Sequence, residues 1–66
     1  MNVIVRAVSK KDKYRRYTVG LTGRLIGGSF VGGGEYQDAV INFTLDDGKK
    51  RIEKPIRYNR VKVQEV

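Results

Sequence analysis

The chain has 66 residues, a formal net charge of +7 at pH 7, no cysteine and no histidine. Its length predicts a single domain, residues 1–66, with a thin core. Without these two residue types the chain lacks disulfides, thiolate metal sites, the usual zinc ligand and the usual general base. The longest apolar run near the N-terminus, residues 3–5, is too short for a signal sequence or a membrane span. We therefore expect a non-enzymatic, cytoplasmic protein with no catalytic residue, metal, cofactor or membrane association.

The charges are segregated along the chain. Residues 1–24 carry seven basic side chains and one acidic one, and residues 49–66 carry seven basic and two acidic ones. Residues 25–48 carry four acidic side chains and no Lys or Arg. The surface is strongly positive wherever the two ends meet, which predicts an anionic partner, most commonly nucleic acid. The acidic middle also leaves open a homo-oligomer in which copies pack head to tail.

The N-terminal quarter predicts one strand followed by a charged loop. Residues 2–8 are rich in Val and Ile and short enough for one strand. Period 2 places Val3, Val5 and Ala7 on the same face of this strand. Residues 9–16 are polar and charged, which indicates a loop.

The next segment is rich in glycine. Two glycines three apart in residues 17–23 indicate a tight turn that leads into a second strand at residues 24–26. Five of the eight residues 27–34 are glycine. This composition is typical of a flexible loop or of a bulged strand end that presents Phe30.

Residues 38–46 show the clearest strand pattern. Four apolar residues alternate with more polar ones: Ala39, Ile41, Phe43 and Leu45. Asp47-Gly48 follows directly and is a strong hairpin signal. The partner strand is expected at residues 49–56, where Pro55 indicates a sheet edge or a strand exit.

The last residues predict a short turn at 56–59 and a final strand at 60–66, with Val61 and Val63 facing inward. No segment has a sustained helical period. Five short strands predict an all-β fold, a small five-stranded SH3-like barrel, because closure removes unprotected edges. The tight hairpin leaves no room for the helix of an OB-fold, and a strand stands where an Sm-like subunit has a helix.

Two stretches resemble a known family. Residues 13–26 (KYRRYTVGLTGRLI) are similar to the basic loop, Gly-x-x-Gly and strand of KOW-type SH3-like domains in ribosomal proteins and transcription elongation factors. Asp47-Gly48, followed by residues 55–59 and 60–63, resembles the end of many small SH3-like barrels. The chain departs from the pattern in its longer first loop and in its glycine-rich stretch. The resemblance implies an SH3-like fold and an association with RNA, RNA polymerase or the ribosome.

The first candidate site is the basic cluster of the first loop. It consists of Lys10, Lys11, Lys13, Tyr14, Arg15, Arg16 and Tyr17. Such a segment contacts successive phosphates with its cations while its rings stack on bases. The alternative is a solvated loop whose tyrosines cap the core.

The second candidate is the C-terminal basic cluster. Its members are Lys49, Lys50, Arg51, Lys54, Arg57, Arg60 and Lys62, with Tyr58 as a further stacking ring. We expect Lys49, Arg51 and Arg57 to share one outer face, and Arg6 to join Arg60 and Lys62. The alternative is edge protection, since charged side chains on edge strands block aggregation.

Other motifs are weaker. The glycine-rich stretch has no following Lys-Ser/Thr or helix, so it does not match a phosphate-binding loop. Gly20-Leu21-Thr22-Gly23 resembles a KH-type clamp but lacks the flanking helices. Asp46-Asp47-Gly48 is explained by turn chemistry and not by a cation site.

These observations predict a non-catalytic nucleic-acid-binding protein with a basic face and low sequence specificity, for DNA or RNA. The predicted contact residues are Lys10, Lys11, Lys13, Tyr14, Arg15, Arg16, Tyr17, Arg57, Tyr58, Arg60 and Lys62. The alternative is a small protein-interaction or regulatory subunit that docks on a larger machine such as RNA polymerase or the ribosome.

Overall fold

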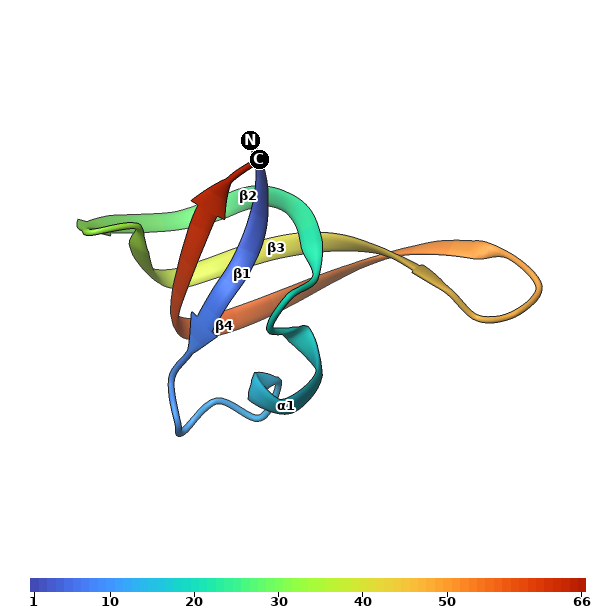
Figure 1. Ribbon diagram of the computed structural model, residues 1–66, viewed down its shortest axis with the longest axis horizontal. Coiled ribbons are helices and arrows are strands. Elements are labelled where there is room, and N and C mark those ends of the chain that lie inside the picture. Colours follow the sequence, from blue (N-terminus) through green and yellow to red (C-terminus); the bar gives the residue numbers. More distant parts are fainter.

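The computed structural model describes all 66 residues as an antiparallel β-sheet with one short helix (Figure 1). In chain order the elements are β1 (Asn2–Val8), α1 (Arg15–Thr18), β2 (Thr22–Gly32), β3 (Glu35–Asp46) and β4 (Arg51–Glu65). The expected β class is confirmed, with four strands where the sequence predicts five. No helix is long and apolar enough to cross a membrane.

The sheet closes on itself. Neighbours pair in the order β1, β2, β3 and β4, and β4 pairs back onto β1. The closing pairs are uneven, because β1 meets β2 only from Asn2 to Ile4 but meets β4 from Val3 to Val8. The molecule measures 38 × 24 × 16 Å, and the β3–β4 hairpin extends beyond the core as a long arm (Figure 1).

The core lies inside the closed sheet. Ten hydrophobic residues are buried: Val3, Val5, Val8, Ala39, Ile41, Phe43, Ile56, Tyr58, Val61 and Val63. The alternation predicted for residues 38–46 is confirmed, with Leu45 half-buried towards the arm. Gly23 faces this core, where a Cβ atom would lie 2.7 Å from Ile41 Cγ2 and 2.8 Å from Phe43 Cδ1. Only glycine therefore fits at this position without displacement of the neighbouring strand.

The predicted facing of β1 is correct only as far as Val5. Ala7 is exposed and Val8 is buried, so the inward pattern changes parity within the strand. The pairing of β1 with β4 shifts register between Val5 and Ala7. A bulge of this kind adds one residue and reverses the faces that follow, and period 2 alone does not reveal it.

The two C-terminal strands of the prediction are one bent strand, β4. Ile56 and Tyr58 face inward at even positions, whereas Val61 and Val63 face inward at odd positions. The change occurs at Asn59–Arg60, close to the predicted turn at residues 56–59. The chain turns here without leaving the sheet, and its last part reaches back to β1.

Pro55 lies within β4 and pairs with Asn42 of β3. β1 pairs with β4 only from Val61 onward, so the other edge of β4 is unpaired at Pro55. A residue without an N–H group is tolerated at such an edge, which is the position the sequence predicts.

The glycine-rich stretch is a bulged strand end. β2 continues to Gly32, and its pairing with β3 shifts register three times between Leu25 and Gly32. Gly33 and Gly34 form the turn with φ angles of 61° and 77°, in the left-handed region that glycine enters without a steric penalty. The second of the two predicted interpretations is therefore correct.

Candidate functional site

The basic loop is anchored to the bend in β4. Asp12 is 9% exposed although cations surround it in the sequence. Its Oδ1 accepts a hydrogen bond from the Tyr14 N–H (2.9 Å) and its Oδ2 accepts one from the Asn59 N–H (3.2 Å). The Ser9 N–H also donates to the Arg60 carbonyl (3.1 Å). These contacts hold the loop against the residues at which β4 changes direction.

A single helical turn, α1, ends the loop. The Thr18 side chain is fully buried, and its hydroxyl donates to the Tyr14 carbonyl at 2.6 Å. Arg15 and Arg16 are therefore held on a short helix and remain exposed. The sequence predicts a loop here, because four residues are too few for a helical period to show.

The anchored loop brings the two basic clusters together through Arg57. Lys11, Lys13 and Arg57 line one open hollow of about 370 Å³, together with Asp12, Tyr14 and Asn59. A second hollow beside it is lined by Lys10, Asp12, Lys13, Arg15 and Arg16. Asp12 is the one acid in either lining, and backbone N–H groups occupy both of its oxygens. The result is one continuous basic surface, the loop face, defined by Lys10, Lys11, Lys13, Arg15, Arg16 and Arg57.

The predicted tyrosines have three different environments. Tyr17 is 61% exposed and free to stack. Tyr14 is half-buried between Tyr17 and Tyr58, with ring centroids 6.0 and 6.1 Å away, and Lys13 Nζ lies 5.0 Å from its ring centroid. Tyr14 therefore caps the core, as the alternative interpretation states, while one side of it supports the loop face.

Tyr58 is a correction to the predicted site. It is fully buried and packs on Phe43 with ring centroids 6.5 Å apart, so it cannot stack on a base. Burial raises the pKa of Tyr58 to about 12. The inward parity of Ile56 in the same strand is the sequence signal that could have placed Tyr58 in the core.

Arg60 and Lys62 lie in a separate hollow. Val8, Ser9 and Glu35 also line it. Arg60 Nε pairs with Glu35 Oε1 at 3.0 Å, so part of its charge is compensated within the molecule. Arg6 does not join this pair, since its guanidinium donates to Gln64 Oε1. These cations therefore stand apart from the loop face.

The arm carries the remaining C-terminal cations, Lys49, Lys50, Arg51 and Lys54. Lys49, Arg51 and Arg57 are all exposed, as expected, but they do not form one cluster. Arg51 and Arg57 are six residues apart on an extended strand, about 20 Å. Figure 1 places the tip of the arm away from α1. At the tip the Asp47 carboxylate accepts the N–H groups of Lys50 (2.9 Å) and Lys49 (3.0 Å), which lowers the pKa of Asp47.

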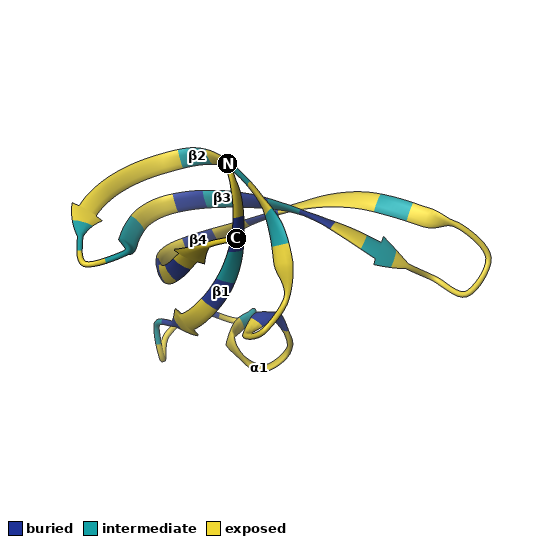
Figure 2. Cartoon of the chain, turned by 45° about the horizontal axis from the view of Figure 1, so that its top comes forward, coloured by how far each residue is buried: buried dark blue, intermediate teal, exposed yellow.

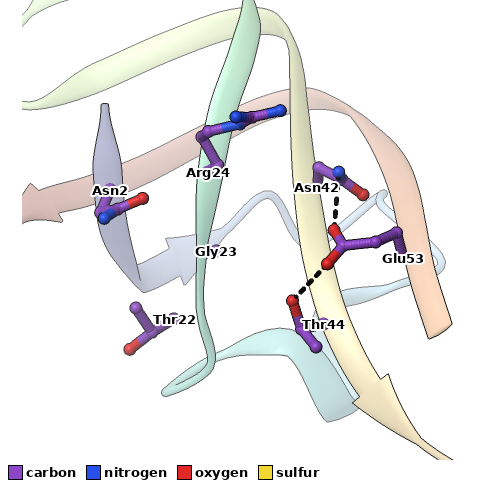
Figure 3. A pocket seen from close by; sticks show the side chains of 7 residues that line it. All are labelled: Asn2, Thr22, Gly23, Arg24, Asn42, Thr44 and Glu53. Carbon is purple, nitrogen blue, oxygen red and sulfur yellow. Dashed lines mark hydrogen bonds between the residues drawn. The ribbon is translucent and has the colours of Figure 1, made fainter. Parts of the chain in front are cut away.

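A polar hollow lies on the outer face of the sheet (Figure 3). Asn2, Thr22, Gly23, Arg24, Asn42, Thr44 and Glu53 line it. Glu53 accepts hydrogen bonds from Asn42 Nδ2 (2.9 Å) and Thr44 Oγ1 (2.8 Å), which links β3 to β4 at the base of the arm. The predicted contact residues do not line it, and no group of three or more His, Cys, Asp or Glu side chains could hold a metal ion. We interpret the hydrogen bonds of Glu53 as cross-strand contacts that stiffen the sheet.

Comparisons with protein-family models, curated proteins and solved structures gave no match. Asp12, Thr18 and Asn59 position the loop face but are not among the residues predicted from the sequence. The one local signal concerns Asp12, which stands two residues before Tyr14, the residue that precedes the helical turn, since Asx turns use that spacing.

Proposed function

We propose that this protein binds nucleic acid without catalysis, through the loop face. The observation that carries the proposal is the shared hollow in which Lys11 and Lys13 from the loop meet Arg57 from β4. Cations that are 44 or more residues apart in sequence converge there with no free carboxylate between them. A phosphodiester backbone is the common polyanion that matches such a row of positive charges.

The anchoring of the loop supports this proposal. A flexible basic loop loses conformational entropy when it binds, whereas a loop held by Asp12 and Thr18 is already ordered. Arg15 and Arg16 can grip phosphate oxygens with two parallel hydrogen bonds. Tyr17, exposed beside them, offers a ring for stacking on a base or sugar.

We expect the protein to bind nucleic acid with little preference for base sequence, because it has no helix that could read base edges in a groove. The one helix has four residues, too few to enter a major groove as a recognition helix. We further propose that the fold is an SH3-like barrel of the KOW type. When the bend at Asn59 is counted as a break, the closed order of strands supports this assignment.

The test is fluorescence anisotropy with labelled single-stranded DNA, duplex DNA and RNA, from 20 to about 300 mM salt. Six cations on the loop face predict a log–log salt slope of up to about −4 on single strands. Binding that persists near 150 mM salt supports the proposal, and the preferred oligonucleotide identifies the class of partner. Loss of all binding well below that salt contradicts it.

The alternative, docking on a larger protein assembly, predicts a different salt response. A protein interface with an apolar centre is much less sensitive to salt than phosphate contacts are. A partner that binds equally well at 50 and 300 mM salt would favour this alternative.

A further inference from the structure

One edge of β2 has no partner strand over most of its length. β1 pairs with β2 only at Thr22, Gly23 and Arg24, and the Leu25 N–H donates to the Met1 carbonyl just beyond. From Ile26 to Gly32, β2 is paired on one side only, with β3. We call residues 26–32 the open edge.

The open edge lacks two of the features that normally protect an exposed edge. It contains no charged residue and no proline. The unpaired edge of β4 contrasts with it, because Arg51, Lys54, Pro55 and Arg57 all lie along that segment. Charged side chains and proline prevent edge-to-edge pairing, and the open edge has only its register shifts for protection.

Large apolar side chains are exposed along this edge. Ile26 is 51% exposed, Phe30 62% and Val31 47%. Gly28, Ser29, Phe30 and Val31 are exposed in succession, so both faces of the strand end meet solvent (Figure 2). The Phe30 ring packs on Tyr36 with centroids 5.2 Å apart, which holds it on the surface in a fixed position.

The charge distribution indicates what covers this edge. The open edge lies in the segment 25–48, which has no Lys or Arg, so no side chain of this edge can form an ion pair with a phosphate. Two copies that each carry +7 repel one another most where their cations face each other. Lys62 and Arg60 pair with Glu35 and Gln37 on the β4 side of β3. The open edge, on the other side of the β2–β3 hairpin, is therefore where two copies can approach without opposing cations.

We propose that a second copy of this chain covers the open edge. Two β2 strands would pair antiparallel about a twofold axis, which makes the interface self-complementary in both backbone hydrogen bonds and apolar side chains. In Figure 1 the β2–β3 hairpin projects away from α1, so the loop face of each copy would stay free in this dimer. This proposal does not depend on the proposed function, since self-association is measured without nucleic acid.

The test is sedimentation equilibrium of the wild-type chain across micromolar to millimolar concentration, with a monomer mass of 7.5 kDa. Val31→Lys places a charge on the open edge and is expected to weaken the dimer. Val19→Lys is the matched control, because it adds the same charge at a position outside the β2–β3 hairpin. Val19 is 48% exposed, close to the value for Val31. Phe30→Ser and Tyr17→Ser form a second pair, with exposures of 62% and 61%.

We expect a concentration-dependent dimer that weakens at least tenfold in Val31→Lys and Phe30→Ser and is unchanged in both controls. Because the chain has no cysteine, a single introduced cysteine reports directly on which residues of two copies lie close together. A Ser29→Cys chain should form a disulfide dimer under mild oxidation faster than a Lys49→Cys chain. A wild-type monomer at every concentration, equal effects in the matched variants, or equal rates for the two cysteines would overturn the proposal.

Discussion

The basic loop and the β3–β4 arm carry similar charge but differ in their support. The loop has five cations between residues 10 and 16, and the arm has Lys49, Lys50, Arg51 and Lys54 near its tip. Asp12 and Thr18 fix the loop to the core, whereas the tip of the arm is held only by its own turn. We therefore expect the loop and not the arm to bind the polyanion, because cations bind it best when they are held in position together.

The largest expected effect comes from reversing charge in one region and then in the other. Arg15→Glu/Arg16→Glu and Lys49→Glu/Lys50→Glu both lower the net charge from +7 to +3. We expect the loop variant to lose affinity for oligonucleotides on the order of 100-fold near 150 mM salt, because it replaces two phosphate contacts by repulsion. The arm variant should lose less than about threefold. Equal losses in anisotropy titrations would mean that net charge alone drives binding.

The second prediction concerns Tyr58, which is buried beneath the basic loop. The arm has no such buried tyrosine. The pKa of Tyr58 is raised from 10.0 to about 12, so its contribution to stability is complete below pH 10 and is lost as pH rises towards 12. Relative to Tyr58→Phe, the wild-type chain should lose about 2 kcal/mol of unfolding free energy between pH 9 and 12. Urea unfolding of both chains measures this difference. Parallel pH profiles would contradict the assignment.

Removal of the Asp12 carboxylate is expected to have a smaller effect on oligonucleotide affinity, in the direction opposite to that expected from net charge. Asp12→Ala raises the net charge to +8 yet should weaken binding severalfold, because the loop loses its attachment to the Asn59 N–H. Stability should fall by about 1–3 kcal/mol.

Asp46→Ala is the matched control for that variant. It makes the same change in charge and removes one hydrogen bond from the Gly48 N–H, but on the arm. Its affinity should stay equal to that of the wild type or increase slightly. Tighter binding by Asp12→Ala than by Asp46→Ala would show that anchoring of the loop does not matter.

The smallest effect belongs to the tip of the arm. The N–H groups of Lys50 and Lys49 lower the pKa of Asp47 below its ordinary value of 3.8. The stabilisation by these hydrogen bonds is present above that value and is lost as pH falls through the lowered pKa. The amide resonances of both lysines should titrate with a midpoint below 3.8, and Asp47→Asn should abolish this transition. A midpoint above 3.8 would contradict the geometry of the turn.

Much of the fold could be predicted from local patterns. The alternation of residues 38–46 and the hairpin signal of Asp47-Gly48 are confirmed, because one buried face imposes period 2 and the turn needs those residues. The predicted number of strands is wrong because the chain bends at Asn59 within the sheet and does not leave it. A bend and a break look alike in sequence, since both interrupt the alternation.

The candidate site was predictable in composition but not in arrangement. The basic loop and Arg57 are found from charge alone, whereas the burial of Asp12 is not, because a lone Asp among cations is ordinarily solvated. Its backbone partner Asn59 is 47 residues away in sequence. Tertiary contacts of this kind leave no local pattern, and they decide which of the cations lie side by side.

The way the sheet closes also has a consequence for the order of folding. β3 and β4 pair across a short turn, with Asp46 opposite Arg51, whereas closure pairs Val3 with Glu65 near the other end of the chain. Loop closure over the longer separation costs more entropy, so we expect the β3–β4 hairpin to form early and β1 to dock last. Val63→Ala should then mainly accelerate unfolding in stopped-flow experiments, with little change in the folding rate. The same order makes β1 the strand that detaches first from the native sheet, so its amides should exchange with solvent faster than those of β3.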